Sequence, residues 1–309
     1  MGTTKHDPRL KQVLAFLALT FGFSWGIFAI AYEKGLFRHG VGIEELPTLA
    51  AFMAGPAIAA LVLTILNRRN SGIVQTLGLH IRPNRWWILA WGLPIILCFG
   101  AALVSKLAGV HLQGPVAAGD ALARVREQLG RRSLIPLSVH GAKLFYASVI
   151  AAATFGSFAN MFATLTEELG WRGYLWSKLR PIGFWKSNGL IGIVWGVWHA
   201  PAIYAGYNYP GERWRGVLMM VLFCVSMAPV IGLMRERGKS VLAASLFHGT
   251  LNGVAGISTM LLVNAPVFWN GAAGWGGLIL VLITDAIIFL RYQPGSYLLP
   301  NSYPQESAV

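Results

Sequence analysis

Three short groups of polar residues interrupt otherwise apolar sequence, and the first contains two adjacent carboxylates, Glu167 and Glu168. In a helix, Glu168 and Arg172 lie four residues apart on one face and can pair, whereas Glu167 points about 100° away. Loss of hydration makes a carboxylate a stronger proton acceptor, so an unpaired Glu167 suits the role of a general base. The alternative is a Glu–Arg pair that only marks the end of a membrane span.

The second and third groups each contain a histidine. Trp195 and His199 are four residues apart, so an indole and an imidazole share one helix face. His248 and Asn252 have the same spacing, which lets an imidazole and a carboxamide donate to one oxygen atom. Taken alone, a histidine on an apolar helix is more often a packing residue than a catalyst.

The elements that must position these groups are membrane spans. The 309 residues are 55% hydrophobic and only 12% charged, with a mean hydropathy of +0.56, whereas about a quarter of a soluble domain is charged. The net charge of +13 comes from Lys and Arg in short clusters between apolar runs, which indicates membrane topology rather than nucleic-acid binding. Both cysteines, Cys98 and Cys224, lie in apolar runs, so neither a disulfide framework nor a cysteine-based metal site is expected.

We predict an all-α, polytopic transmembrane bundle of about eight spans with both termini cytoplasmic. Each apolar run is long enough, or nearly so, to cross about 30 Å of hydrocarbon. The runs are 13–31, 46–66, 86–107, 144–165, 190–204, 217–234, 242–263 and 276–290. Of the 25 Lys and Arg, fifteen fall on the side of the termini, Arg172 and Arg235 among them, and an excess of this kind marks the cytoplasm.

The chain is divided into a cytoplasmic N-terminus (1–11), the bundle (12–292) and a flexible C-terminal tail (293–309). The motif-bearing core of the bundle covers about 141–263. Within the longest connection, 109–141, apolar residues at helical spacing predict a surface helix at about 119–132 that lies along the membrane plane. A solvated loop fits this connection equally well.

The three polar groups are expected at similar depths in the membrane, so they could line one site. At about 1.5 Å per residue, His248 lies about 10 Å and His199 about 15–18 Å from the cytoplasmic ends of their spans, and the acidic pair lies in the same half. A shared hydrated cavity would satisfy all of these groups together. Asp285, alone on the last span, is instead interpreted as a hydrogen-bonding group between packed helices.

The combined pattern resembles a known family. Glu167-Glu168-x-x-x-Arg172, Trp195-x-x-x-His199 and His248-x-x-x-Asn252 occur in this order on successive spans. They resemble the three signature motifs of the CPBP family, which contains type II CAAX prenyl endopeptidases and related bacteriocin-immunity proteins. The resemblance covers about 85 residues, and it departs from the usual motif where Trp195 stands in place of Phe.

The resemblance implies an intramembrane endopeptidase and a role for each motif residue. Glu167, with His199, would activate a water molecule for attack on a peptide carbonyl. His248 and Asn252 would face the developing oxyanion. The remaining motif residues are expected to support the site: Glu168, Arg172 and Trp195.

The same residues leave two possibilities for a cofactor. Glu167, His199 and His248 supply the ligand types of a catalytic zinc site with one open position. The family is often described as metalloproteases, but resemblance to its CAAX-processing members implies that the glutamate and histidines act without metal. We therefore expect no cofactor and keep Zn²⁺ as the alternative.

We expect an integral, multi-pass protein of a bacterial inner (plasma) membrane, with its active site in the cytoplasmic half. Its partners would be the lipid bilayer and a protein or peptide substrate, prenylated or not. We expect the substrate to be cut near its C-terminus. No nucleic-acid partner and no particular oligomeric state are predicted. One alternative function is a non-catalytic immunity or partner-binding protein of the same family. Another is an ion-coupled transporter, although the sequence has no inverted repeat and no paired broken helices.

Overall fold

The architecture is all-α, as predicted. The computed structural model describes residues 8–37, 42, 44–67, 72–129 and 139–291. Most of the predicted N-terminal segment, the end of the predicted surface helix at 130–132 and the predicted C-terminal tail lie outside these residues. Within them, the β-structure is a two-stranded antiparallel sheet that pairs His111 with Val263 and Leu112 with Leu262.

The helices follow one another with short connections. The first part of the chain contains α1 (Pro8–Glu33), α2 (Leu46–Met53), α3 (Gly55–Leu66), α4 (Ile73–Leu77) and α5 (Arg85–Leu107). The middle part contains β1 (His111–Leu112), α6 (Pro115–Leu129), α7 (Gly141–Ala151), η2 (Ala152–Gly156), α8 (Ser157–Glu168), η3 (Leu169–Leu175), α9 (Trp176–Leu179) and η4 (Arg180–Ile182). The last part contains α10 (Phe184–Trp198), α11 (Ala200–Tyr204), α12 (Arg213–Arg237), α13 (Val241–Thr259), β2 (Leu262–Val263), η5 (Val267–Trp269) and α14 (Trp275–Arg291).

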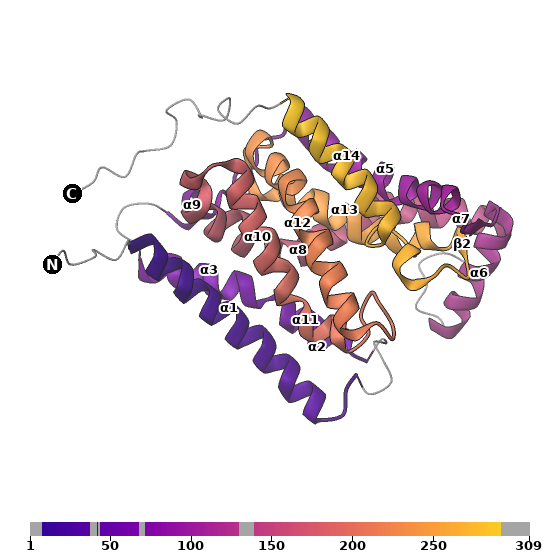
Figure 1. Ribbon diagram of the computed structural model, residues 1–309, viewed down its shortest axis with the longest axis horizontal. Helices are drawn as coiled ribbons and strands as arrows, with labels where there is room; N and C mark the ends of the chain where they lie inside the picture. Colours follow the sequence, from indigo (N-terminus) through magenta and orange to yellow (C-terminus); the bar gives the residue numbers. More distant parts are fainter. Residues whose placement is uncertain (1–7, 38–41, 43, 68–71, 130–138, 292–309) are drawn as a thin grey trace.

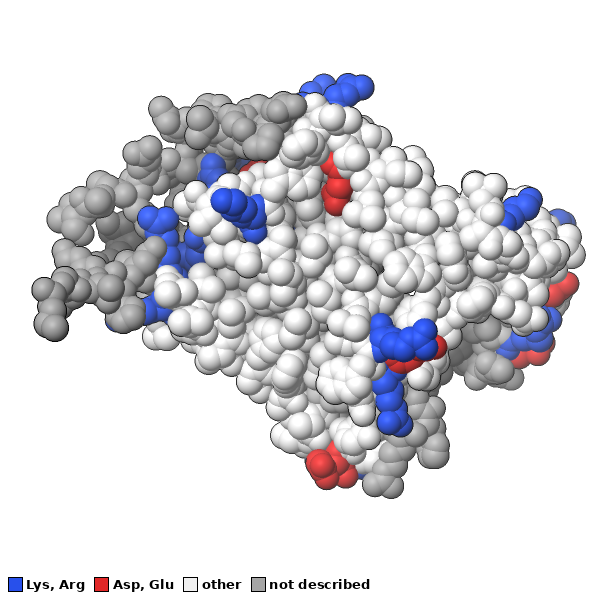
Figure 2. Space-filling model, in the orientation of Figure 1, with Lys and Arg blue, Asp and Glu red and all other residues white. Residues whose placement is uncertain are grey.

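Six helical segments of the described chain are long and apolar enough to cross a membrane. They are Arg9–Glu33, Leu46–Leu66, Arg85–Leu107, Gly141–Ile182, Arg213–Arg237 and Val241–Thr259. The other two predicted spans correspond to shorter helices, α10 with 15 residues and α14 with 17. Figure 2 shows charged residues mainly towards the ends of the helices, with an almost entirely uncharged surface between them. The chain is thus a multi-pass membrane protein, while eight crossings and cytoplasmic termini stay predictions.

The centre of the bundle is formed by α8, α10, α12 and α13, with α1 and α14 at opposite edges (Figure 1). Small residues allow the central helices to approach closely, which is the usual way to gain packing energy where lipid competes for apolar contacts. A Cβ at Gly253 would lie 3.1 Å from backbone atoms of Gly156 and Ser157, and one at Gly196 would lie 2.6 Å from the Cα of Val221. These contacts bring α13 against η2 and α8, and α10 against α12.

A polar contact fixes α8 against α13. The Thr164 hydroxyl, which is fully buried, lies 3.0 Å from the main-chain oxygen of Ser245 and donates to it. Thr164 precedes the acidic pair by one turn, and Ser245 precedes His248 by one turn. The contact therefore sets the first and third polar groups at the same level of the bundle.

The helix in the predicted span 190–204 is interrupted at His199. α10 ends at Trp198, and α11 begins at Ala200 with Pro201 in its first turn. Proline has no N–H to donate and its ring crowds the carbonyl four residues earlier, so Pro201 weakens the helix at this point. The break places His199 at a helix end rather than inside a helix.

The fourth predicted span, 144–165, is too short. The helical segment continues without interruption from Gly141 to Ile182 and includes the two π-helical stretches η2 and η3. The regular α-helix ends at Glu168, and the wider π turns then carry Arg172. The seventh predicted span, 242–263, is slightly too long, because α13 ends at Thr259 and the chain then enters β2.

The close approach of α10 to α12 predicts that Gly192→Ala destabilises the protein by about 1–3 kcal/mol. A Cβ at this position would lie 2.6 Å from the Cα of Val225 and 2.8 Å from the main-chain oxygen of Cys224. Gly189→Ala on the same helix is the control, since nothing lies within 4 Å of its Cβ and alanine favours the helix. Thermal unfolding in detergent measures both variants, and equal midpoints would contradict this packing.

Candidate active site

Glu168, at the end of α8, is fully buried and has two partners on one carboxylate oxygen. Arg172 Nη1 donates to Glu168 Oε1 at 3.0 Å, and His248 Nδ1 lies 2.9 Å from the same atom. The expected pairing of Glu168 with Arg172 is therefore present. The contact with His248 was not predicted, and it joins α8 and η3 to α13.

Glu167 points away from this pair and contacts Trp195. The indole Nε1 of Trp195 donates to Glu167 Oε2 at 2.9 Å, and the Arg172 guanidinium lies over the same indole at 4.7 Å from the ring centre. The expectation of a carboxylate without a partner is thus wrong, because an uncharged donor holds it in one orientation. Both carboxylates are buried, Glu167 with an exposed fraction of 3% and Glu168 with none.

His199 is oriented by the break between α10 and α11. Its Nδ1 lies 2.8 Å from the main-chain oxygen of Trp195. Because a carbonyl oxygen can only accept, Nδ1 carries the proton, and Nε2 of the neutral ring is left as an acceptor. The structure therefore presents His199 in the form that can take a proton from water.

His248 approaches the same indole from α13. Its ring centre lies 5.3 Å from that of Trp195, and the ring centre of His199 lies 5.7 Å from Trp195 on the α10 side. Nδ1 of His248 faces a carboxylate, so it donates there, and Nε2 is the nitrogen that remains for a ligand. Nε2 can accept a hydrogen bond when the ring is neutral and can donate one when the ring carries both protons.

Asn252 is the motif residue that the structure leaves outside this cluster. It lies one turn beyond His248 on α13, its side chain is exposed, and within the described chain it makes no hydrogen bond to the other motif residues. Its role as an oxyanion donor stays a prediction. The other six motif residues are joined through Trp195 and Glu168.

Tyr207 lies between α11 and α12, outside the three motifs. Loss of hydration, and secondarily the charge of Glu167, raise the pKa of the Tyr207 phenol, although 38% of the side chain is exposed. The raised pKa keeps the phenol neutral, so its hydroxyl can donate a hydrogen bond. No spacing rule links it to the motifs, since the chain between His199 and Tyr207 reverses direction through α11 and a turn.

The arrangement does not fit the zinc alternative. Among the described residues, no group of three or more His, Cys, Asp or Glu side chains could hold a metal ion. Glu167, His199 and His248 are each oriented by a different protein group, and the spacing between them is not that of a set of metal ligands. We therefore derive no chemical step through a metal, and metal-independent catalysis stays a prediction.

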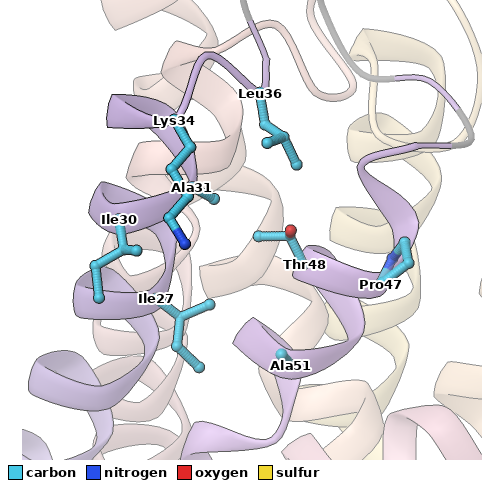
Figure 3. A pocket seen from close by; sticks show the side chains of 8 residues that line it. All are labelled: Ile27, Ile30, Ala31, Lys34, Leu36, Pro47, Thr48 and Ala51. Carbon is cyan, nitrogen blue, oxygen red and sulfur yellow. The ribbon is translucent and has the colours of Figure 1, made fainter.

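Two other features were compared with the cluster. A pocket of about 360 Å³ between the end of α1 and the start of α2 has an apolar lining with Lys34 directed into it, and none of its lining residues belongs to a motif (Figure 3). Asp285 on α14 lacks the expected hydrogen bond to another helix, since its buried Oδ1 has no partner in the described part of the chain. Neither feature contributes to the candidate site.

The buried pair predicts that Arg172→Ala lowers the free energy of unfolding by about 3–5 kcal/mol, because Glu168 would lose its guanidinium partner in a site without solvent. Arg215→Ala is the control, since the Arg215–Glu212 pair at 3.1 Å has side chains 75% and 25% exposed and should contribute at most about 1 kcal/mol. Unfolding in detergent measures both. A fully stable Arg172→Ala protein would contradict the assignment of Glu168 as the structural carboxylate.

Comparison with known proteins concerns the part of the chain that contains this cluster. Residues 149–254 match the family described as Type II CAAX prenyl endopeptidase Rce1-like. A relative from Methanococcus maripaludis, CAAX prenyl protease 2, is 32% identical over 101 residues, which cover 31% of this chain and 37% of the relative. The alignment thus spans little more than a third of the relative's length. Over the residues that carry the site, the chain is similar to type II CAAX prenyl endopeptidases, and the resemblance of the three motifs is confirmed.

Proposed function

We propose that this protein is an intramembrane endopeptidase of the CAAX-processing type. The observation that carries the proposal is one cluster of side chains. The indole of Trp195 contacts the Glu167 carboxylate and the imidazoles of His199 and His248. The second carboxylate, Glu168, is paired with Arg172. The similarity of residues 149–254 to type II CAAX prenyl endopeptidases supports the same reaction class.

In the proposed reaction, Glu167 and His199 activate a water molecule. The water oxygen attacks the peptide carbonyl carbon while its proton passes to the Glu167 carboxylate or to Nε2 of His199. The tetrahedral intermediate then breaks its C–N bond, and the same proton is delivered to the departing amine. Atoms balance with water as the only co-reactant, and the products are a new carboxylate and a new amine.

His248 has the position of an electrostatic stabiliser in this scheme. Its Nδ1 is held by Glu168, so a charged ring would direct Nε2–H at the developing oxyanion, with Asn252 as the second donor. Donors of this kind are most effective where water is scarce, because the local dielectric constant is low. Arg172 neutralises Glu168 and restrains its position.

We propose a protein or peptide substrate that is cut near its C-terminus and reaches the site from the bilayer. The relative from Methanococcus maripaludis is named as a CAAX prenyl protease, and a prenyl chain next to the cleaved bond would give a substrate affinity for the hydrocarbon around the bundle. We place the site in the cytoplasmic half of a bacterial inner membrane. The clusters of Lys and Arg between the spans favour an orientation with both termini in the cytoplasm, and this orientation puts the site in that half.

Glu167→Gln is expected to abolish peptide cleavage while leaving the midpoint of unfolding nearly unchanged. An amide still accepts the hydrogen bond from Trp195, but it cannot take a proton from water at neutral pH. The measurement is cleavage of lipidated and unlipidated C-terminal peptides by purified protein.

Glu33→Gln, at an exposed carboxylate at the end of α1, is the matched control and should retain full turnover. Cleavage by Glu167→Gln at the wild-type rate would contradict the proposed base. Absence of turnover in the wild-type protein on every peptide would favour the non-catalytic binding protein.

Removal of metal is expected to leave the rate of cleavage unchanged. Protein dialysed against a strong chelator and checked for residual zinc by elemental analysis should cleave the same peptides as untreated protein. Loss of turnover on stripping, with recovery on addition of zinc, would overturn the metal-independent mechanism.

A further inference from the structure

Arg235 lies outside the three motifs but contacts the segment that carries Arg172. It is the third-last residue of α12, and only 3% of it is exposed. Its Nε donates to the main-chain oxygen of Arg172 at 3.0 Å. Arg235 and Arg172 were both counted among the topology signals, and the structure buries both side chains.

Two further contacts fix the guanidinium of Arg235. It lies over the ring of Trp176 on α9, with its carbon 4.9 Å from the ring centre. On another side it packs against Gly78, where a Cβ would overlap with Nη2 and lie 2.7 Å from the guanidinium carbon. Gly78 has a positive φ of 71°, so glycine is favoured there both by the backbone and by the proximity of Arg235.

The same contacts reach the helix that carries His248. The main-chain oxygen of Gly78 accepts a hydrogen bond of 2.9 Å from Val241, the first residue of α13. Arg235 thus lies where the ends of α4 and α12, the start of α13 and η3 meet. From η3 the contacts continue through the Arg172 side chain to Glu168, and from Glu168 to His248.

We propose that Arg235 is a positioning residue for hydrolysis, which acts by holding the backbone of η3 at Arg172 and thereby the Glu168–His248 pair. This inference rests on the proposed function. It adds a residue that lies between the second and third motifs in the sequence and belongs to neither.

The physical reason lies in the π-helical turn. A π-helix is less favourable than an α-helix and persists where the surroundings stabilise it, and here a buried side-chain donor binds one of its carbonyl groups. Displacement of that carbonyl would move Arg172, and the 3.0 Å contact between Arg172 and Glu168 would transmit the movement to His248. A misplacement of about 1 Å in a catalytic group can cost up to about 100-fold in rate.

The test is steady-state peptide cleavage by the full-length protein in detergent or liposomes. Arg235→Gln is expected to lower kcat by about 10- to 100-fold with KM within about twofold. Arg235→Lys, which keeps a charged donor over Trp176, should recover most of kcat. Arg237→Gln, two residues further along α12, is the matched control and should retain wild-type kcat.

A second measurement does not require activity. The imidazole ¹⁵N signals of His248, assigned by their absence from His248→Ala, should shift in Arg235→Gln and remain unchanged in Arg237→Gln. If Arg235→Gln does not fold, Gly78→Ala replaces it, because the new methyl group displaces the guanidinium while Arg235 is retained.

The outcomes separate the two proposals. A folded Arg235→Gln protein with a lower unfolding midpoint but unchanged kcat and unchanged His248 signals would show a purely stabilising residue and overturn the inference. If the wild-type protein cleaves no peptide, the proposed function fails and the His248 signals decide alone. A shift would then support the positioning of His248 by Arg235, and no shift would overturn it.

Discussion

The structure depends on the burial of a charged pair inside an apolar bundle. Glu168 and Arg172 are both fully buried, and a charge in such a place costs several kcal/mol unless another charge and good hydrogen bonds compensate for it. Because both residues lie on one continuous helical segment, their pairing alone would not fix the fold. The approach of His248 to the same carboxylate oxygen supplies this long-range constraint, since α13 must adopt one depth and one rotation against α8 for the contact to form. The hydroxyl contact of Thr164 with Ser245, one turn away on each helix, sets the same register.

Trp195 has a comparable function on the third helix of the site. Its ring lies under the Arg172 guanidinium and near His248, its N–H binds Glu167, and its main-chain oxygen binds His199. Phenylalanine, which often occupies this motif position in the resembled family, would preserve the ring contacts but would have no donor for Glu167. The orientation of the Glu167 carboxylate in this protein therefore depends on a feature that the motif itself does not require.

Contacts within one helical turn could be predicted from the sequence, whereas contacts between helices could not. The pairing of Glu168 with Arg172 follows from a spacing of four residues, and the all-α fold follows from the length of the apolar runs. The contact of His248 with Glu168 joins residues 80 positions apart and depends on helix rotations that hydropathy does not encode. Spacing alone also placed Asn252 beside His248, but equal spacing does not make two side chains meet the same partner. The burial of Arg235 could not be predicted, because a cation near the end of a span has the same sequence pattern whether it faces the solvent or the protein.

Two adjacent glutamates can have different roles because the helix directs them to different surroundings. Glu168 meets Arg172 and His248 on one oxygen and has no exposed surface, so its contacts hold α8, η3 and α13 together. Glu167 meets a neutral indole and keeps a small exposed fraction, so its negative charge is oriented without being strongly stabilised. The break at Pro201 completes this division, because it turns His199 so that its protonated nitrogen faces a backbone carbonyl and its basic nitrogen stays available. In the proposed reaction, the atoms that Glu167 and His199 offer to a water molecule are therefore those that remain after the contacts with Trp195 have formed.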